Sequence, residues 1–277
     1  MQKTERVING SKEKPITLDI SYTQNGKIKP ILIFCHGFKG FKDWGHFDLI
    51  AKTFAQNDFV YVKFNFSYNG TTTEHLTDFA DLEAFGNNNF SIELDDLGIV
   101  IDYMEMNASL FEGNHHQIYL MGHSRGGGIA ILKAYEDKRI QKLVTWASVK
   151  DAADFFSTQN IGLWKENGQV FTFNARTQQN MPLNYQLYEN YQANKECLDI
   201  PKAAANLHIP WLIIHGSNDT SVPFAVGQQL LQWNPTSTWI LIENADHTFG
   251  GKHPWDALDL PADSQKAVQK TIEFLKE

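Results

Sequence analysis

Residues 117–130 read QIYLMGHSRGGGIA, and this stretch is the most informative part of the chain for predicting the fold. The apolar run Ile118–Met121 predicts a buried strand, and the apolar spacing that starts at Ile129 predicts a helix directly after it. Between them, residues 122–126 form a G-x-S-x-G sequence. A serine in such a sharp strand-to-helix turn exposes its hydroxyl at the sheet edge, and the flanking glycines leave room for the turn. The stretch therefore predicts a nucleophile elbow with Ser124 as the nucleophile.

Length and composition restrict the class of protein. The chain has 277 residues, of which 42% are hydrophobic and 20% charged, as in one large or two small globular domains. The net charge is -8 and no cluster of lysine and arginine stands out, so nucleic acid is not an expected partner. Cys35 and Cys197 are far apart, which does not indicate a disulfide scaffold. No apolar run is long enough to cross a membrane, and the N-terminal residues lack the apolar segment of a signal peptide, so we expect a cytoplasmic protein.

The hydrophobic pattern predicts strands that alternate with helices. Such alternation is typical of an α/β protein with a doubly wound, mostly parallel sheet, covered by helices on both faces. Polar residues 67–92 are expected to form a long loop, and the start of the helix after them is left open. The expected strands are 6–9, 16–22, 31–35, 59–66, 118–121, 143–146, 211–214 and 239–242, and the expected helices are 47–54, 94–104, 129–135, 222–231 and 264–275.

A long insertion interrupts this alternation. Residues 1–150 and 203–277 are expected to form the core, and residues 151–202 an inserted cap or lid over the active edge of the sheet. Loops of this length are usually functional or disordered, which favours a cap. The alternative is an extra helical layer without a role in substrate binding. The insertion is rich in aromatic residues, namely Phe155, Phe156, Trp164, Phe171, Phe173, Tyr185, Tyr188 and Tyr191.

A serine nucleophile requires a histidine base that is held by a carboxylate. In hydrolases with this kind of elbow, the acid follows the serine in the chain and the histidine comes last. Asp219 and His247 each follow an apolar run that predicts a strand. Because the carboxyl ends of parallel strands lie at one edge of the sheet, we expect both side chains beside Ser124. The sequence thus predicts a Ser124, Asp219 and His247 triad.

Other residues compete for some of these roles. Asp151 and Asp154 follow the strand that ends near Trp146 and are alternative acids. Asp246 is adjacent to His247 in the chain and is a poor candidate to orient it. The remaining histidines near strand ends are interpreted as turn packing: His36, His123 and His215.

The developing negative charge of an acyl-transfer reaction needs hydrogen-bond donors. One donor is expected from the backbone N–H of Arg125, directly after the nucleophile, and the other from Phe38, in the loop after an earlier strand. Motifs for metals and nucleotides are missing: there is no H-E-x-x-H or C-x-x-C, and neither a dinucleotide-binding motif nor a P-loop. We therefore expect no metal and no cofactor.

The chain contains four short motifs: His36-Gly37-Phe38, Gly122–Gly126, Gly216–Pro223 and Asp246–Phe249. Together they resemble the α/β-hydrolase superfamily, and most closely its dienelactone-hydrolase-like, serine-aminopeptidase-like and feruloyl-esterase-like branch. The resemblance covers nearly the whole chain outside the insertion. It implies the triad of Ser124, Asp219 and His247, with the amides of Phe38 and Arg125 as oxyanion donors. The chain departs from these relatives in two places: Arg125 replaces the more usual Gln or Met, and residues 65–70 lack the Asp-x-Arg-Gly of many relatives.

Together these features predict a serine hydrolase that cleaves a carboxylic ester of a small molecule through an acyl-enzyme on Ser124. The alternatives are an aminopeptidase-like serine peptidase, an acyltransferase, and a hydrolase-fold protein that only binds a ligand. The sequence assigns neither the substrate-binding residues nor the oligomeric state.

Overall fold

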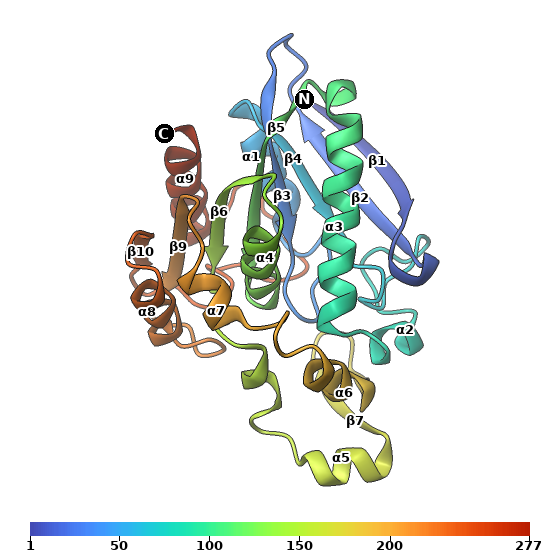
Figure 1. The fold of residues 1–277 in the computed structure, drawn as a ribbon. Coiled ribbons are helices and arrows are strands. Elements are labelled where there is room, and N and C mark those ends of the chain that lie inside the picture. Colours follow the sequence, from blue (N-terminus) through green and yellow to red (C-terminus); the bar gives the residue numbers. More distant parts are fainter.

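An eight-stranded sheet forms the centre of the computed structural model, which describes residues 1–277 (Figure 1). The strand order is β1-β2-β4-β3-β5-β6-β9-β10. The six strands from β4 to β10 in this order are parallel to one another, while β2 is antiparallel to both β1 and β4. This confirms the predicted mostly parallel, doubly wound sheet. The strands are β1 (Gln2–Asn9), β2 (Pro15–Tyr22), β3 (Lys29–Cys35), β4 (Val60–Phe64), β5 (Gly113–His123), β6 (Ile140–Trp146), β9 (Trp211–Gly216) and β10 (Thr238–Ile242).

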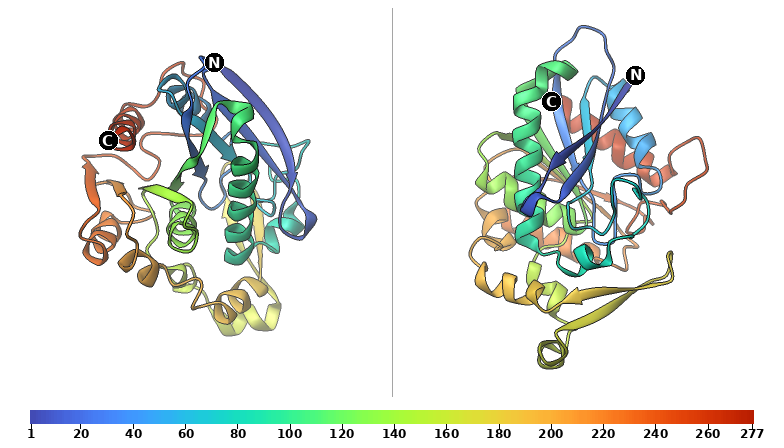
Figure 2. Two further views of the ribbon diagram at one scale, coloured as in Figure 1. Left: turned by 45° about the horizontal axis from the view of Figure 1, so that its top comes forward. Right: turned by 90° about the vertical axis from the view of Figure 1, so that its right-hand side faces the viewer.

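Helices cover both faces of the sheet, with α1 and α9 on the face opposite to α3 and α4 (Figure 2). Successive residues of a strand point to opposite faces, so β3 contributes to two separate cores. Ile31 and Ile33 pack under α3 and α4, whereas Leu32 and Phe34 pack under α1 and α9. An unbroken apolar run is therefore required in this strand. The helices are α1 (Phe47–Gln56), α3 (Phe90–Asn107), α4 (Arg125–Glu136), α7 (Ile200–Ala205), α8 (Phe224–Trp233) and α9 (Ala262–Lys276). None of the helices has both the length and the hydropathy needed to cross a membrane.

The long loop predicted over residues 67–92 contains one short helix, α2 (Leu82–Gly86), and its predicted end is wrong, because residues 90–92 already belong to α3. The side chain of Asn89 accepts a hydrogen bond from the N–H of Ile92 at 3.0 Å and so caps the start of α3. An N-cap asparagine satisfies one of the backbone donors that a helix leaves unpaired at its start. The helix whose start the sequence left open thus begins at Phe90.

Residues 151–202 contain short helices and a small antiparallel hairpin. Figure 1 places α5, β7 and α6 at the lower end of the molecule, away from both termini. The hairpin was not predicted, and the predicted end of the insertion at residue 202 lies inside α7. The elements are the 3-10 helix η3 (Ala152–Phe156), α5 (Ile161–Asn167), β7 (Gln169–Asn174), β8 (Gln179–Asn184) and α6 (Gln186–Ala193).

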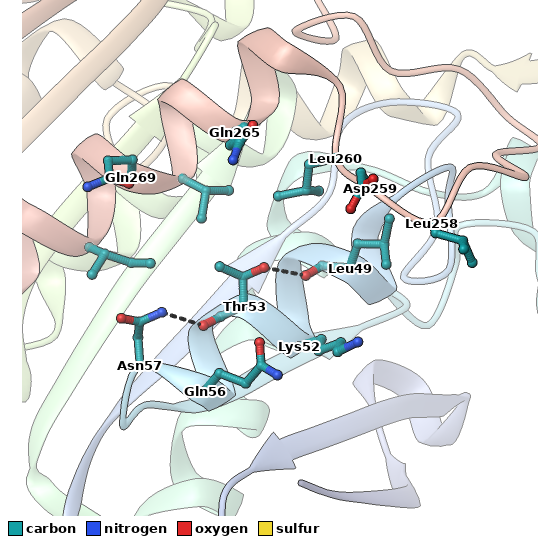
Figure 3. Close-up of a pocket in the computed structure, with 12 residues that line it drawn as sticks. Leu49, Lys52, Thr53, Gln56, Asn57, Leu258, Asp259, Leu260, Gln265 and Gln269 are labelled. Atoms are coloured by element: carbon teal, nitrogen blue, oxygen red, sulfur yellow. Dashed lines mark hydrogen bonds between the residues drawn. The ribbon is translucent and has the colours of Figure 1, made fainter.

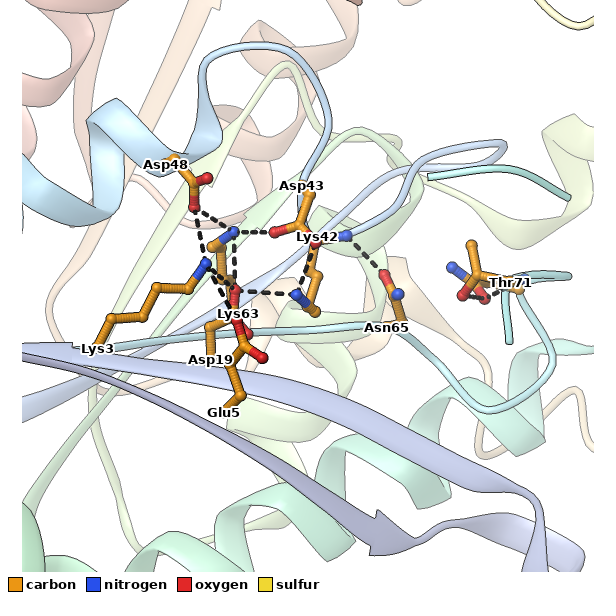
Figure 4. A network of polar contacts seen from close by, with 10 residues as sticks. Lys3, Glu5, Asp19, Lys42, Asp43, Asp48, Lys63, Asn65 and Thr71 are labelled. Carbon is orange, nitrogen blue, oxygen red and sulfur yellow. Dashed lines mark hydrogen bonds and ion pairs between the residues drawn. The ribbon is translucent and has the colours of Figure 1, made fainter. Parts of the chain in front are cut away.

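A network of charges, buried at Asp19, Lys42 and Lys63, ties the loop after β3 to the sheet (Figure 4). The ammonium group of Lys63 lies 3.1 Å from Asp19 and 2.7 Å from Asp48, and it also contacts Asp43. Lys42, on the loop, lies 2.9 Å from Asp19. Oxygens of Asp19, Asp43 and Asp48 lie within 4.8 Å of one another, as metal ligands would. The ammonium of Lys63 already contacts all three carboxylates. Together with the ammonium groups of Lys3 and Lys42, it compensates their three negative charges.

Stability at low pH is expected to depend on Asp19. Burial favours the neutral carboxyl, but Lys63 and Lys42 outweigh it and hold the pKa of Asp19 at about 2, below its ordinary value of 3.8. The folded state thus prefers the ionised carboxylate, and this contribution is complete above the unfolded-state pKa and lost as pH falls towards 2. In Asp19→Asn, the free energy of unfolding should fall less steeply between pH 5 and pH 2 than in the wild type, as measured by urea unfolding.

The control for this experiment is Asp256→Asn, which changes an exposed aspartate without an ion pair. Its pH dependence should match that of the wild type. If Asp19→Asn also follows the wild-type curve, the lysine network does not stabilise the ionised form of Asp19.

The two glycines around Ser124 have no space for a side chain. A Cβ atom on Gly126 would lie 2.4 Å from the carbonyl oxygens of Cys35 and His36, and one on Gly122 would lie 2.3 Å from the carbonyl oxygen of Gly126. All of these atoms belong to the backbone, so no flexible side chain can move aside.

We therefore expect Gly126→Ala to reduce the free energy of unfolding by about 3 kcal/mol or more, because α4 would be pushed away from β3. Urea unfolding measures this effect. Gly162→Ala is the matched control, since its Cβ meets only ordinary contacts, at 3.6 Å or more. Equal unfolding midpoints for the two variants would contradict the close approach of α4 to β3.

Candidate active site

Ser124 lies between β5 and α4 in a strained backbone conformation, with φ 56° and ψ -122°. A positive φ is costly for a residue with a side chain, and it persists only where the surrounding structure enforces it. The Ser124 N–H donates to the carbonyl of Trp146 at 2.9 Å, and the Ser124 carbonyl accepts from the N–H of Gly127 at 3.0 Å. These bonds hold the sharp strand-to-helix turn that the sequence predicts.

The structure brings Asp219 and His247 together from two different loops. Asp219 follows β9 and His247 follows β10, and Asp219 Oδ2 lies 2.8 Å from His247 Nδ1. Because the carboxylate can only accept, the proton of this bond lies on Nδ1 of the imidazole. The neutral ring then has its lone pair on Nε2, which is the form that a general base needs.

Backbone and side-chain donors hold Asp219 in its ionised form. Its Oδ1 accepts from the N–H groups of Ser221 at 2.9 Å and Val222 at 2.8 Å. His215 Nε2 lies 3.3 Å from the Asp219 Oδ2 atom. Burial of the carboxyl would raise its pKa, but the contacts with His215 and His247 lower it far below the ordinary range. Asp219 is therefore charged at neutral pH.

The competing acids lie in other environments. The Asp151 side chain caps η3 by accepting from the N–H of Ala153 at 2.8 Å, and Asp154 lies 3.3 Å from the ammonium of Lys150. Asp246 accepts from the backbone of its own turn. None of the three contacts a ring nitrogen of His247, so Asp219 is the only carboxylate paired with that histidine.

The two amides predicted as oxyanion donors are free of protein acceptors. Neither the Phe38 N–H nor the Arg125 N–H donates a hydrogen bond within the chain. The Phe38 loop lies against the elbow, because a Cβ on Gly37 would approach the Ser124 Cβ to 3.0 Å. Two unpaired amides beside a serine are the arrangement required to stabilise a developing oxyanion.

Two histidines that the sequence left as turn packing contact the Asp219–His247 pair. His215 Nε2 donates to the Val222 carbonyl at 2.8 Å and lies beside Asp219, as described above. His123 Nε2 donates to the carbonyl of His247 at 2.8 Å. The only sequence signal for these contacts was the position of each histidine at a strand end. The Ser124 hydroxyl forms no hydrogen bond with His247 here.

A cavity of about 290 Å³ lies next to the elbow. The Arg125 side chain forms one wall, with its Nε 2.8 Å from Glu93 Oε2 and its guanidinium 4.0 Å from the centre of the Phe90 ring. Phe155, from the insertion, forms another wall, and its ring centre is 5.2 Å from that of Phe38. The other lining residues are Val149, Asp151, Ala152, Asp154, Ser221, Val222, Pro223 and Val226.

A larger hollow, of about 500 Å³, lies elsewhere, between α1 and α9 (Figure 3). Its walls contain amides, a lysine and an aspartate, but no serine, cysteine or histidine. It therefore offers no nucleophile or base for acyl transfer. The smaller cavity is lined by Arg125, the residue directly after Ser124, and is the better candidate for substrate binding.

Comparisons with known proteins agree with this architecture. The family model described as BD-FAE matches residues 18–233. No curated protein matches the chain. Ferulic acid-bound Est1E from Butyrivibrio proteoclasticus is 17% identical, with a TM-score of 0.73, and the match covers 98% of this chain and 100% of that one. The esterase domain from a Rhodothermus marinus protein is 14% identical, with a TM-score of 0.66 and coverage of 99% and 98%. A puromycin-hydrolyzing peptidase of Mycobacterium tuberculosis is 12% identical, with a TM-score of 0.67, and the match covers 99% of this chain but 39% of the peptidase.

Proposed function

This chain belongs to the BD-FAE family and has the α/β-hydrolase fold, and on that basis we propose that it is a serine esterase. The observation that carries the proposal is the strained Ser124 turn, which lies beside two unpaired amides on the sheet edge that also holds the Asp219–His247 pair. The names of two structural neighbours, an esterase domain and a ferulic acid complex, support ester hydrolysis as the reaction.

The proposed mechanism uses an acyl-enzyme. Ser124 Oγ attacks the acyl carbon of the ester while His247 Nε2 takes the hydroxyl proton. The carbonyl oxygen becomes an oxyanion and accepts hydrogen bonds from the N–H groups of Phe38 and Arg125. The intermediate collapses, the ester C–O bond breaks, and His247 returns the proton to the leaving alcohol. A water molecule then attacks the acyl-enzyme in the same way, with His247 as the base, and releases the carboxylic acid and free Ser124.

We also propose that residues 151–202 act as a cap on this site. Phe155 packs on Phe38, the residue that carries one of the oxyanion donors. Lys39, the next residue, donates to the carbonyl of Phe173 in the hairpin at 3.2 Å. The insertion thus contacts the loop of Phe38 and Lys39 at two points. Its residue Phe155 also lines the cavity where a substrate would bind.

Turnover of a panel of esters tests the proposed function. The panel contains p-nitrophenyl esters of varied acyl length, feruloyl esters and aminoacyl anilides. We expect release of p-nitrophenol from at least one ester, with an initial burst where deacylation is slow. Absence of hydrolysis for every ester, in a protein that remains folded, would contradict the proposal.

A serine peptidase is the second candidate, because Asp151 and Asp154 line the cavity and could receive the ammonium group of an aminoacyl substrate. The puromycin-hydrolyzing neighbour has a name consistent with this activity. The ester panel separates the two candidates: a peptidase should favour aminoacyl anilides, and Asp151→Asn should weaken their turnover more than that of uncharged esters.

A further inference from the structure

His123 is the residue between Gly122 and the nucleophile, and it contacts the main chain of the proposed base. Its Nε2 lies 2.8 Å from the carbonyl oxygen of His247, and the two ring centres are 4.8 Å apart. The two residues are separated by 124 positions in the chain. The bond therefore joins the elbow directly to the loop after β10.

This is the only hydrogen bond made by the main chain of His247. The His247 N–H donates to no acceptor, and its carbonyl accepts from no other group. The flanking residues have their own bonds: the Asp246 carbonyl accepts from the N–H of Phe249 at 3.2 Å, and Asp246 Oδ1 accepts from the N–H of Thr248 at 3.0 Å. The main chain of His247 takes part in neither of them. Asp219 fixes the ring of His247 through Nδ1, whereas His123 fixes the backbone from which the ring extends.

The His123 ring has the protonation state that this contact requires. A carbonyl oxygen only accepts, so Nε2 carries the hydrogen and a neutral ring leaves Nδ1 without one. Burial, together with the charge that His247 can carry, lowers the pKa of His123 to about 3. A neutral ring next to His247 does not repel the imidazolium that forms there during acyl transfer.

We propose that His123 is a positioning residue that sets the place of the His247 imidazole relative to Ser124. The inference rests on the proposed function of Ser124 and His247. The nucleophile and the residue that anchors its base are adjacent in the chain, so one short turn determines both positions. A loss of this bond would leave the main chain of His247 without a fixed partner. Since a misplacement of about 1 Å can cost about 100-fold in rate, the effect should appear in kcat.

The experiment compares His123→Gln with His123→Asn on a p-nitrophenyl ester. The glutamine amide nitrogen can reach the place of His Nε2, whereas the asparagine amide is one methylene shorter and reaches only the place of Nδ1. We expect His123→Asn to lower kcat by about 10- to 100-fold with KM within about twofold, and His123→Gln to keep kcat within about fivefold of the wild type. The two variants carry the same amide, so a general loss of packing would affect both.

Two further measurements separate the possible outcomes. The free energy of unfolding is measured for both variants, and if His123→Asn does not fold, His123→Leu replaces it as a ring-sized variant without a donor. The rate of fluorophosphonate labelling reports on nucleophile activation and should fall together with kcat. If the wild type is labelled but kcat falls equally in the Gln and Asn variants, or in neither, the positioning role alone is overturned. An unlabelled wild type would overturn the proposed function and, with it, this inference.

Discussion

Ser124→Ala is expected to lower kcat for ester hydrolysis by about 10⁵-fold or more, because loss of the nucleophile removes the covalent route. The residual rate should come from the Phe38 and Arg125 amides and from substrate binding. Alanine keeps the Cβ that lies close to Gly37, so the fold of the elbow should be retained. The measurement is steady-state turnover of the best p-nitrophenyl ester, together with the amplitude of the burst.

The control for this variant is Ser157→Ala, which removes an exposed hydroxyl outside the cavity lining. It should hydrolyse the ester at the wild-type rate. Retention of more than about 1% of the wild-type kcat by Ser124→Ala would mean that another group performs the attack, since a triad serine contributes far more than that.

Asp219→Asn is expected to lower kcat by about 10⁴-fold while the fold is retained. The asparagine amide can donate to His247 Nδ1, which would favour the tautomer with its proton on Nε2. That tautomer cannot accept the proton of Ser124. Asp219 also accepts from Ser221 and Val222, and an asparagine oxygen can keep these bonds. The kcat of the ester reaction, measured beside the free energy of unfolding, separates the chemical loss from a structural one.

The rival acids provide the comparison for Asp219. Asp151→Asn and Asp154→Asn change the wall of the cavity but not the partner of His247, so each should cost less than about tenfold in kcat for an uncharged ester. A loss near 10⁴-fold in either variant, with a small loss in Asp219→Asn, would assign the acid to the loop after β6.

The sheet could be predicted because its signal is local. The unbroken apolar run of β3 requires burial on both faces, and the structure places Ile33 and Phe34 in different cores. The elbow could be predicted for the same reason, since strand, turn and helix are contiguous in residues 117–130. The resemblance to α/β-hydrolases added the order of acid and histidine after the serine.

The rest of the candidate site depends on contacts between distant residues. The sequence indicated only a packing role for His123. Its partner is the backbone carbonyl of His247, and residue types do not show which carbonyl accepts a hydrogen bond. The network around Lys63 joins β2, β4, α1 and the loop after β3, so its members are scattered over the N-terminal part of the chain. The hairpin of β7 and β8 was missed because its turn has no strong signal, and Pro182 lies within the second strand.

Site-resolved fluorophosphonate labelling tests the central claim most directly. The folded protein is incubated with the probe, and the modified peptide is identified by mass spectrometry after proteolysis. The account predicts one covalent adduct, on Ser124 within the peptide that contains residues 117–130, and none in Ser124→Ala. No adduct on the folded wild type, or an adduct on another residue that persists in Ser124→Ala, would contradict it.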